Sequence, residues 1–141
     1  MSICENFVQL ATRTEAPSNP DLMRRLTDNA REIHAFMGLL TEVGELVDAY
    51  KKHIFYGKPL DDVNVKEEVG DILWYIAILL DVGGVSFAEC MEAVIAKLRV
   101  RYPEKFTEQS AIERDLVQER QTLESHFQED TKDVGAVTEK E

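Results

Sequence analysis

The chain is poor in the residues that mark several common classes of protein. Only two of its 141 residues are cysteines, Cys4 and Cys90, and they stand far apart with no metal-ligand pattern around them. Disulfides are typical of small secreted domains, so we expect a reduced intracellular protein. No run reaches about 18 apolar residues without a charge, and no positively charged segment leads into an apolar one. We therefore expect a soluble, cytoplasmic protein without a membrane partner.

Basic residues are scarce relative to acidic ones. Lys and Arg number 16 against 27 Asp and Glu, which gives a formal net charge of −11. A surface that binds nucleic acid needs clustered Lys and Arg, so we expect no nucleic acid among the partners. An anionic substrate would be repelled by this chain unless metal ions offset the charge.

Strand-like alternation of apolar and polar residues is absent, and helical signals fill the chain. Capping boxes predict helix starts at Asn64 with Glu67, Ser86 with Glu89, and Ser110 with Glu113. With the Gly and Pro stops, the expected helices cover residues 3–13, 20–55 with an interruption within 27–30, 65–83, 87–102 and about 111–127. The fold class is all-α, a four- to five-helix bundle in one domain over residues 1–127. Residues 128–141 are expected to form a disordered acidic tail.

Two near-copies of one tetrapeptide, Glu42-Val43-Gly44-Glu45 and Glu68-Val69-Gly70-Asp71, lie within apolar helical sequence. Acids three residues apart on a helix form one patch, and charges among apolar neighbours are expensive unless they are paired or bind a metal. The glycine in each copy suggests backbones that approach closely. One such pair alone would be a solvated face, whereas two copies favour Mg²⁺ or Mn²⁺ bound by carboxylate oxygens. The candidate metal ligands are Glu42, Glu45, Glu68 and Asp71.

A second group of residues can contact an anionic or aromatic ligand. Lys97 and Arg101 project from one helix face and can bind phosphate oxygens. The alternative is that they are solvated basic residues, which the helix dipole favours at the C-terminal end of a helix. Lys52, two turns beyond Glu45, is a weaker phosphate candidate. Three residues are candidates for contact with a nucleobase, with packing or structural roles as the alternative: His34, Trp74 and Tyr75.

The second acidic helix is apolar around nearly its whole circumference. One small bundle can hardly cover such a helix, so we expect a homo-oligomer, a homodimer or homotetramer that shares its core.

These motifs and their flanks resemble the MazG-like all-α nucleoside triphosphate pyrophosphohydrolases. The likeness covers about residues 25–106, and these segments look like the compact single-domain MazG-like proteins of bacteria and phages. It is carried by the segments 40–45, 56–61, 67–75 and 97–103. The same superfamily also holds dimeric dUTPases and phosphoribosyl-ATP pyrophosphatase.

The resemblance implies Mg²⁺ or Mn²⁺ held by the four acids, with Lys97 and Arg101 on the phosphates of a nucleoside triphosphate. It implies cleavage between the α- and β-phosphates to give a nucleoside monophosphate and pyrophosphate, with Glu42 or Glu45 as the base. The family usually has an asparagine where this chain has Val94, which leaves the substrate preference open. The resemblance suggests a purine deoxynucleotide such as dGTP in a phage, with dUTP, dCTP or phosphoribosyl-ATP as alternatives.

Two other classes of helical protein would need different features in the sequence. A di-iron carboxylate bundle needs Glu-x-x-His pairs, and the residues three before the histidines are Arg31, Tyr50 and Leu123. That class is excluded. A non-enzymatic helical adaptor is the remaining alternative, and it predicts that Glu42→Gln or Asp71→Asn changes nothing measurable with nucleotides.

Overall fold

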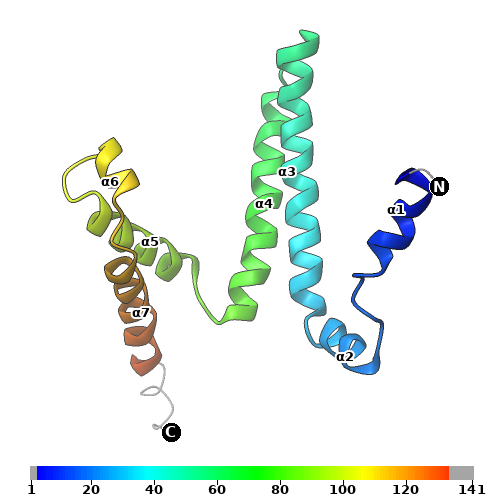
Figure 1. Cartoon of the computed structure of the whole chain (residues 1–141). Coiled ribbons are helices and arrows are strands. Elements are labelled where there is room, and N and C mark those ends of the chain that lie inside the picture. The colour runs from blue at the N-terminus through cyan, green and yellow to red at the C-terminus, as the bar shows by residue number, and fades with distance from the viewer. Residues whose placement is uncertain (1–2, 134–141) are drawn as a thin grey trace, which may run out of the picture. The chain divides into compact units, whose positions relative to one another are not determined.

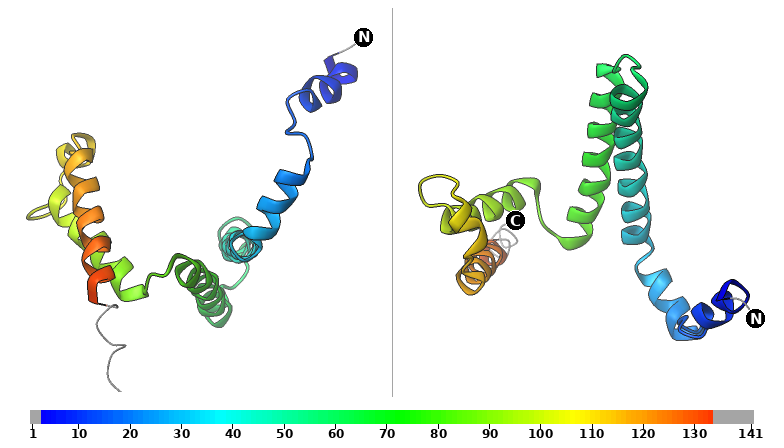
Figure 2. Two further views of the ribbon diagram at one scale, coloured as in Figure 1. Left: turned by 90° about the horizontal axis from the view of Figure 1, so that it is seen from below. Right: turned by 45° about the horizontal axis from the view of Figure 1, so that its top comes forward.

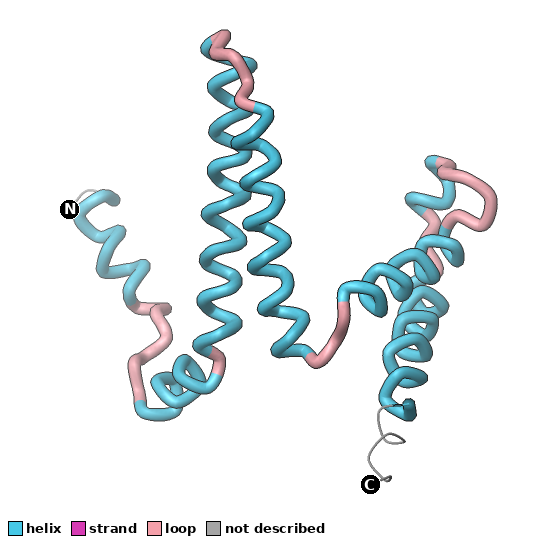
Figure 3. Tube along the Cα trace, turned by 180° about the vertical axis from the view of Figure 1, so that it is seen from behind, coloured by secondary structure: helices cyan, strands magenta, loops and turns pink. Residues whose placement is uncertain are grey.

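A computed structural model of the chain describes residues 3–133, and that range contains helices and no strand (Figure 3). The all-α class predicted from the sequence is confirmed. The helices, labelled in Figure 1, are α1 (Ile3–Thr12), α2 (Pro20–Asp28), α3 (Ala30–Tyr56), α4 (Asp62–Gly83), α5 (Phe87–Arg101), α6 (Glu108–Ile112) and α7 (Leu116–Asp133). They fall into two compact units, Met1–Ile72 and Leu73–Glu141, with the boundary inside α4.

The first unit is organised around α3. The predicted interruption before this helix lies at Asn29, whose backbone N–H donates to the Arg25 carbonyl. The helix ends at Tyr56 and is capped by Gly57, which has a φ of 65°, a left-handed conformation that suits glycine at a helix C-terminus. A short loop then reverses the chain, so that the first half of α4 runs antiparallel beside α3 (Figure 1, Figure 2).

The start of α4 differs from the prediction. The helix begins at Asp62 rather than near Val65, because the side chain of Asp61 accepts the backbone N–H groups of Val63 and Asn64 at 3.0 and 3.2 Å. Asp is as good an N-cap as Asn and comes first in the chain after the loop. The predicted capping box at Asn64 is therefore wrong. Asn64 lies within the first turn of the helix, and its side chain is available to the site described below.

In the second unit, α5 packs against α7. The predicted capping box of α5 is confirmed, because Ser86 and Glu89 each accept the other's backbone N–H. The one predicted at Ser110 is wrong: Thr107 caps the short helix α6, and Ser110 donates its backbone N–H to Thr107.

The C-terminal helix also differs from its predicted limits. The side chain of Asp115 accepts the backbone N–H of Gln118, so α7 begins at Leu116 rather than near residue 111. It runs to Asp133, so residues 128–133, predicted to lie in a disordered tail, are helical. The rest of that predicted tail, residues 134–141, lies outside the described residues.

Few apolar side chains are fully buried within one copy of the chain. Ala35 and Ala93 are the buried apolar residues of the described part. On α3, apolar side chains alternate four and three residues apart, the spacing of a seam that packs against another helix. We call this set the α3 stripe; its members are between 41% and 74% exposed, and they are Phe36, Leu40, Val43, Val47, Tyr50 and Ile54.

No single described helix is long and apolar enough to cross a membrane. Helices α4 and α5 reach that length and composition only when taken together, across a bend of 91°.

Candidate metal and nucleotide site

Three of the four predicted metal ligands meet where α3 lies against the first half of α4. Glu42 comes from α3, and Glu68 and Asp71 come from α4. One carboxylate oxygen from each lies within 4.8 Å of the others. Glu68 is buried, Glu42 is half-buried and Asp71 is exposed, so the cluster opens to solvent on one side. Oxygen donors of this kind are the ligands that Mg²⁺ and Mn²⁺ prefer.

Electrostatics within this cluster disfavour the fully ionised state. Partial burial raises the pKa of the Glu42 carboxyl above its ordinary value. A side-chain hydrogen bond with Glu68 and the negative charges of Glu45 and Asp71 raise this pKa further. Carboxylates gathered this closely repel one another unless a proton or a cation lies between them. The donor set therefore fits a divalent cation, whose charge would offset that repulsion.

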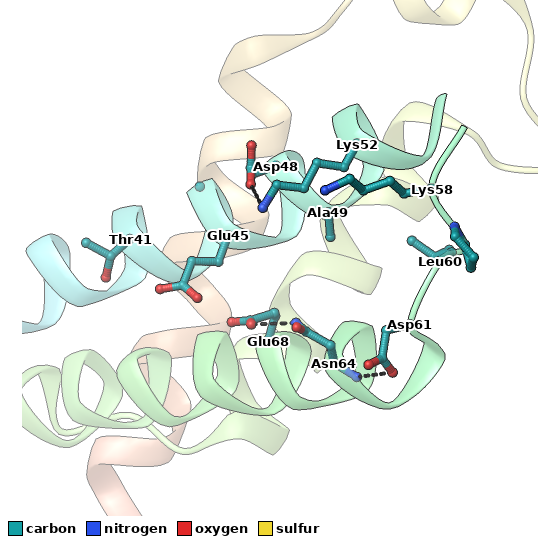
Figure 4. A pocket seen from close by; sticks show the side chains of 12 residues that line it. Thr41, Glu45, Asp48, Ala49, Lys52, Lys58, Leu60, Asp61, Asn64 and Glu68 are labelled. Atoms are coloured by element: carbon teal, nitrogen blue, oxygen red, sulfur yellow. Dashed lines mark hydrogen bonds and ion pairs between the residues drawn. The ribbon is translucent and has the colours of Figure 1, made fainter. Parts of the chain in front are cut away.

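Glu45 lies beside this cluster rather than within the group of three. It lines an open cavity of about 460 Å³ next to the buried carboxylate of Glu68 (Figure 4). The other lining residues come from α3, from the loop and from the start of α4: Thr41, Gly44, Asp48, Ala49, Lys52, Lys58, Pro59, Leu60, Asp61 and Asn64. The fourth predicted ligand thus faces space that a ligand can enter.

The predicted phosphate contact Lys52 lines the same cavity and already has an anionic partner. Its Nζ lies 2.5 Å from Asp48, which also pairs with Lys51. The hydrogen bonds from Lys51 and Lys52 lower the pKa of Asp48 to about 2, so this carboxylate stays ionised at neutral pH. Lys52 would have to share or exchange this partner in order to bind a phosphate.

Two residues of the site were missed from the sequence. The side-chain amide of Asn64 donates to Glu68 Oε1 at 2.6 Å, which fixes the orientation of the buried carboxylate. Lys58 reaches the cavity from the loop after α3. The sequence signals for both are present: Asn64 is predicted as a helix cap, and Lys58 lies in the helix stop Gly57-Lys58-Pro59 and in segment 56–61 of the family resemblance, with no site role predicted for either.

The glycines of the two acid motifs do not have the role expected from the sequence. A Cβ added at Gly44 or at Gly70 would meet no heavy atom within 4 Å outside its own helix. Close approach of backbones within the described chain therefore does not explain them, and that prediction is wrong for one copy of the chain.

The remaining candidates are divided between the units. His34 is exposed on α3 in the first unit. Trp74 is 56% exposed and packs edge-on against Tyr75, with ring centroids 4.8 Å apart, in the second unit. Lys97 is half-buried on α5, and Arg101, on the same helix, binds Glu119 of α7. Contact of these residues with a nucleotide stays a prediction.

The fold and the site together define the class of this protein. It is an all-α protein with a carboxylate cluster suited to a divalent cation. The family model of the MazG nucleotide pyrophosphohydrolase domain matches residues 31–106. The chain belongs to this family, and the match includes both acid motifs as well as Lys97 and Arg101. Nucleotide pyrophosphohydrolases are hydrolases that act on nucleotides and generally use divalent metals. No curated protein and no solved structure matches the chain.

Proposed function

We propose that this protein hydrolyses a nucleoside or deoxynucleoside triphosphate between the α- and β-phosphates, releasing a nucleoside monophosphate and pyrophosphate. The observation that carries the proposal is the meeting of Glu42 with Glu68 and Asp71 in a chain of the MazG family. For the substrate we propose a purine deoxynucleotide such as dGTP, in a phage. The alternatives are dUTP, dCTP and phosphoribosyl-ATP.

In this proposal the acids hold Mg²⁺ or Mn²⁺ and the basic residues hold phosphates. Glu42, Glu68 and Asp71 supply neighbouring oxygens, and Glu45 supplies another from the cavity side. When bound, a divalent cation polarises the α-phosphoryl group and lowers the pKa of a coordinated water. Glu42 and Glu45 are the two candidates for accepting a proton from the attacking water.

The rest of the nucleotide would be held by residues outside the acid cluster. Lys97 and Arg101, with Lys52 as a weaker partner, would bind phosphate oxygens. Lys58 stands beside Lys52 on the same cavity, so it can take part if Lys52 keeps its bond with Asp48. His34, Trp74 and Tyr75 are proposed to contact the base.

The test is the release of pyrophosphate from a panel of dGTP, dATP, dCTP, dUTP, GTP, ATP and phosphoribosyl-ATP, with Mg²⁺ or Mn²⁺ and with a chelator as control. We expect the highest kcat/KM with dGTP or dATP and no release under the chelator. Preference for dUTP, dCTP or phosphoribosyl-ATP would replace the purine proposal with one of its alternatives. No release from any member would favour the helical adaptor.

We further propose that the protein assembles as a homodimer or homotetramer. The support is the α3 stripe, a row of exposed apolar side chains at a spacing typical of helix-to-helix packing. On a helix, the stripe points away from the face that carries Glu42 and Glu45. A second copy can therefore cover the stripe while the acid cluster stays open.

Asn64 gives a test of how the buried carboxylate is held. Some residues orient a metal ligand by hydrogen-bonding to it without touching the metal. Removing such a residue typically lowers metal affinity 10- to 100-fold. Because Asn64 donates to Glu68 Oε1, we expect Asn64→Ala to weaken Mn²⁺ binding by about that factor in a calorimetric titration. The matched control is Asn29→Ala, which removes an amide that donates to the Arg25 carbonyl, away from the acid cluster. Equal Mn²⁺ affinity in Asn64→Ala and the wild type would show that Glu68 needs no such support.

A further inference from the structure

Helix α7 lies outside the residues matched by the family model, yet it supplies one of the two buried acidic side chains of the described chain. Glu119 is 4% exposed, and the other buried acid is Glu68 of the metal cluster. A buried carboxylate is unfavourable unless it is paired. The partners of Glu119 therefore indicate what this side chain does.

Two arginines bind Glu119, each through two nitrogens. Arg101 of α5 donates from Nε to Oε1 at 2.8 Å and from Nη2 to Oε2 at 2.5 Å. Arg114, just before α7, donates from Nε to Oε1 at 3.3 Å and from Nη2 to Oε2 at 2.7 Å. Such paired bonds between a guanidinium and a carboxylate fix the orientation of both groups. Arg101 is therefore held in one position on α5.

Two guanidinium groups and one carboxylate leave this cluster with one positive charge in excess. The hydrogen bonds from Arg101 and Arg114 lower the pKa of Glu119, and those to Glu119 raise the pKa of Arg101. A guanidinium has five N–H donors, and Glu119 takes two of those on Arg101. The three donors that Glu119 does not take are on Nη1 and on the outer side of Nη2. These donors belong to a side chain that is 16% exposed and that also interacts with Tyr102, whose ring centroid lies 5.7 Å from Cζ. They form the edge of the guanidinium at which a second anion can bind.

We propose that Glu119 is a positioning residue for Arg101, which it holds so that the Nη1 edge of the guanidinium is presented to the phosphates of the nucleotide. This inference rests on the proposed function, in which Arg101 binds phosphate oxygens. A guanidinium fixed before the substrate arrives loses less conformational freedom on binding than a free one. Helix α7 thereby becomes part of the phosphate-binding machinery.

The opposite role, in which Glu119 occupies the place of a phosphate until substrate displaces it, fits the contacts less well. Displacement would leave a buried carboxylate with Arg114 as its remaining partner. It would also break the ion pair that links α5 to α7, two helices that pack together. Such a displacement resembles the removal of one partner from a buried ion pair, which is unfavourable because it leaves a buried charge without compensation.

The test is a double-mutant cycle on pyrophosphate release. Glu119→Gln keeps the size of the side chain and removes its charge, so we expect kcat/KM to fall about 10- to 100-fold because Arg101 is no longer held. Glu119→Asp should recover part of the loss. In the Arg101→Ala background, Glu119→Gln should cause no further fall, since its whole effect passes through Arg101. The control is Glu124→Gln on the same helix, which breaks an exposed pair with Arg120 and should stay within about twofold.

Three results would overturn the inference. Unchanged kcat/KM in Glu119→Gln would show that Arg101 needs no support, and increased kcat/KM would show that Glu119 competes with phosphate. An equal fall in the Arg101→Ala background would indicate a structural role only. Each of these leaves the proposed function standing, whereas an inactive wild type would remove both.

A second variant keeps the test decisive if Glu119→Gln fails to fold. Arg114 is 41% exposed at its side chain and touches the same carboxylate. We expect Arg114→Gln to lower kcat/KM severalfold in the wild type and to have no effect in the Arg101→Ala background. An equal fall in both backgrounds would contradict the inference.

Discussion

Replacing Glu68 with glutamine is expected to lower kcat/KM for pyrophosphate release at least about a hundredfold. Glutamine keeps the shape of the side chain but removes the charge from a buried ligand of the cluster. A metal ion contributes several kcal/mol to stabilising the transition state, and about 1.4 kcal/mol corresponds to a tenfold change in rate. The measurement is steady-state pyrophosphate release at saturating Mg²⁺, with dGTP as the first substrate.

The same substitution should leave the metal-free protein folded and somewhat more stable. A side-chain hydrogen bond with Glu68 and the negative charge of Glu68 raise the pKa of Glu42 and so disfavour the ionised form of Glu42. An acid whose pKa is raised on folding destabilises the protein as the pH rises through that pKa. Removing the charge of Glu68 should therefore raise the midpoint of thermal unfolding at neutral pH without metal, while activity falls.

The matched control is Glu67→Gln, one residue earlier on α4, where the side chain is exposed and outside the cavity lining. It should keep kcat/KM within about twofold, as expected of surface substitutions away from a site. If Glu68→Gln kept activity at the level of Glu67→Gln, the acid cluster would not be the catalytic site. If Glu68→Gln failed to fold, Glu68 would instead be a residue that the fold needs for its stability.

If the protein is the proposed homo-oligomer, replacing Val47 with glutamate is expected to break the contact between copies and lower the molar mass. Val47 is 61% exposed at the centre of the α3 stripe. Burial of a valine side chain contributes about 1.5 kcal/mol or more, so its loss weakens association at least about tenfold, and burying an unpaired charge weakens it further. The measurement is molar mass by light scattering during size-exclusion chromatography at micromolar protein.

The control for this variant makes the same change outside the stripe. Val63 is 73% exposed in the first turn of α4, where an acidic side chain interacts favourably with the helix dipole. Val63→Glu should elute with the wild-type mass. A Val47→Glu protein that kept the wild-type mass, or a wild type that is itself monomeric, would show that a second copy does not cover the α3 stripe.

Much of the fold followed from local signals, because capping and helix termination are short-range chemistry. The left-handed Gly57 and the capping box of Ser86 with Glu89 were readable from a few neighbouring residues. The errors arose where two neighbouring residues can serve as caps. Asp61 competes with Asn64, and Thr107 competes with Ser110, and in each case the earlier residue caps the helix.

The part of the candidate site that follows the helical spacing of acidic residues was predictable from the sequence. Two acid pairs on two helices predicted a shared carboxylate site, and Glu42 does meet Glu68 and Asp71. The bond from Asn64 to Glu68 depends on where α4 begins, so it followed only once the start was known. The ion pair of Arg101 with Glu119 joins residues from two helices that pack together, and no local pattern marks such a pair.

The most direct test of the account is to locate Mn²⁺ by anomalous scattering in crystals grown with a non-hydrolysable nucleoside triphosphate. We expect an anomalous peak about 2.1 Å from carboxylate oxygens of Glu42, Glu68 and Asp71, with phosphate oxygens completing its coordination. A bound nucleotide whose phosphates and Mn²⁺ lie away from these three carboxylates would contradict the account.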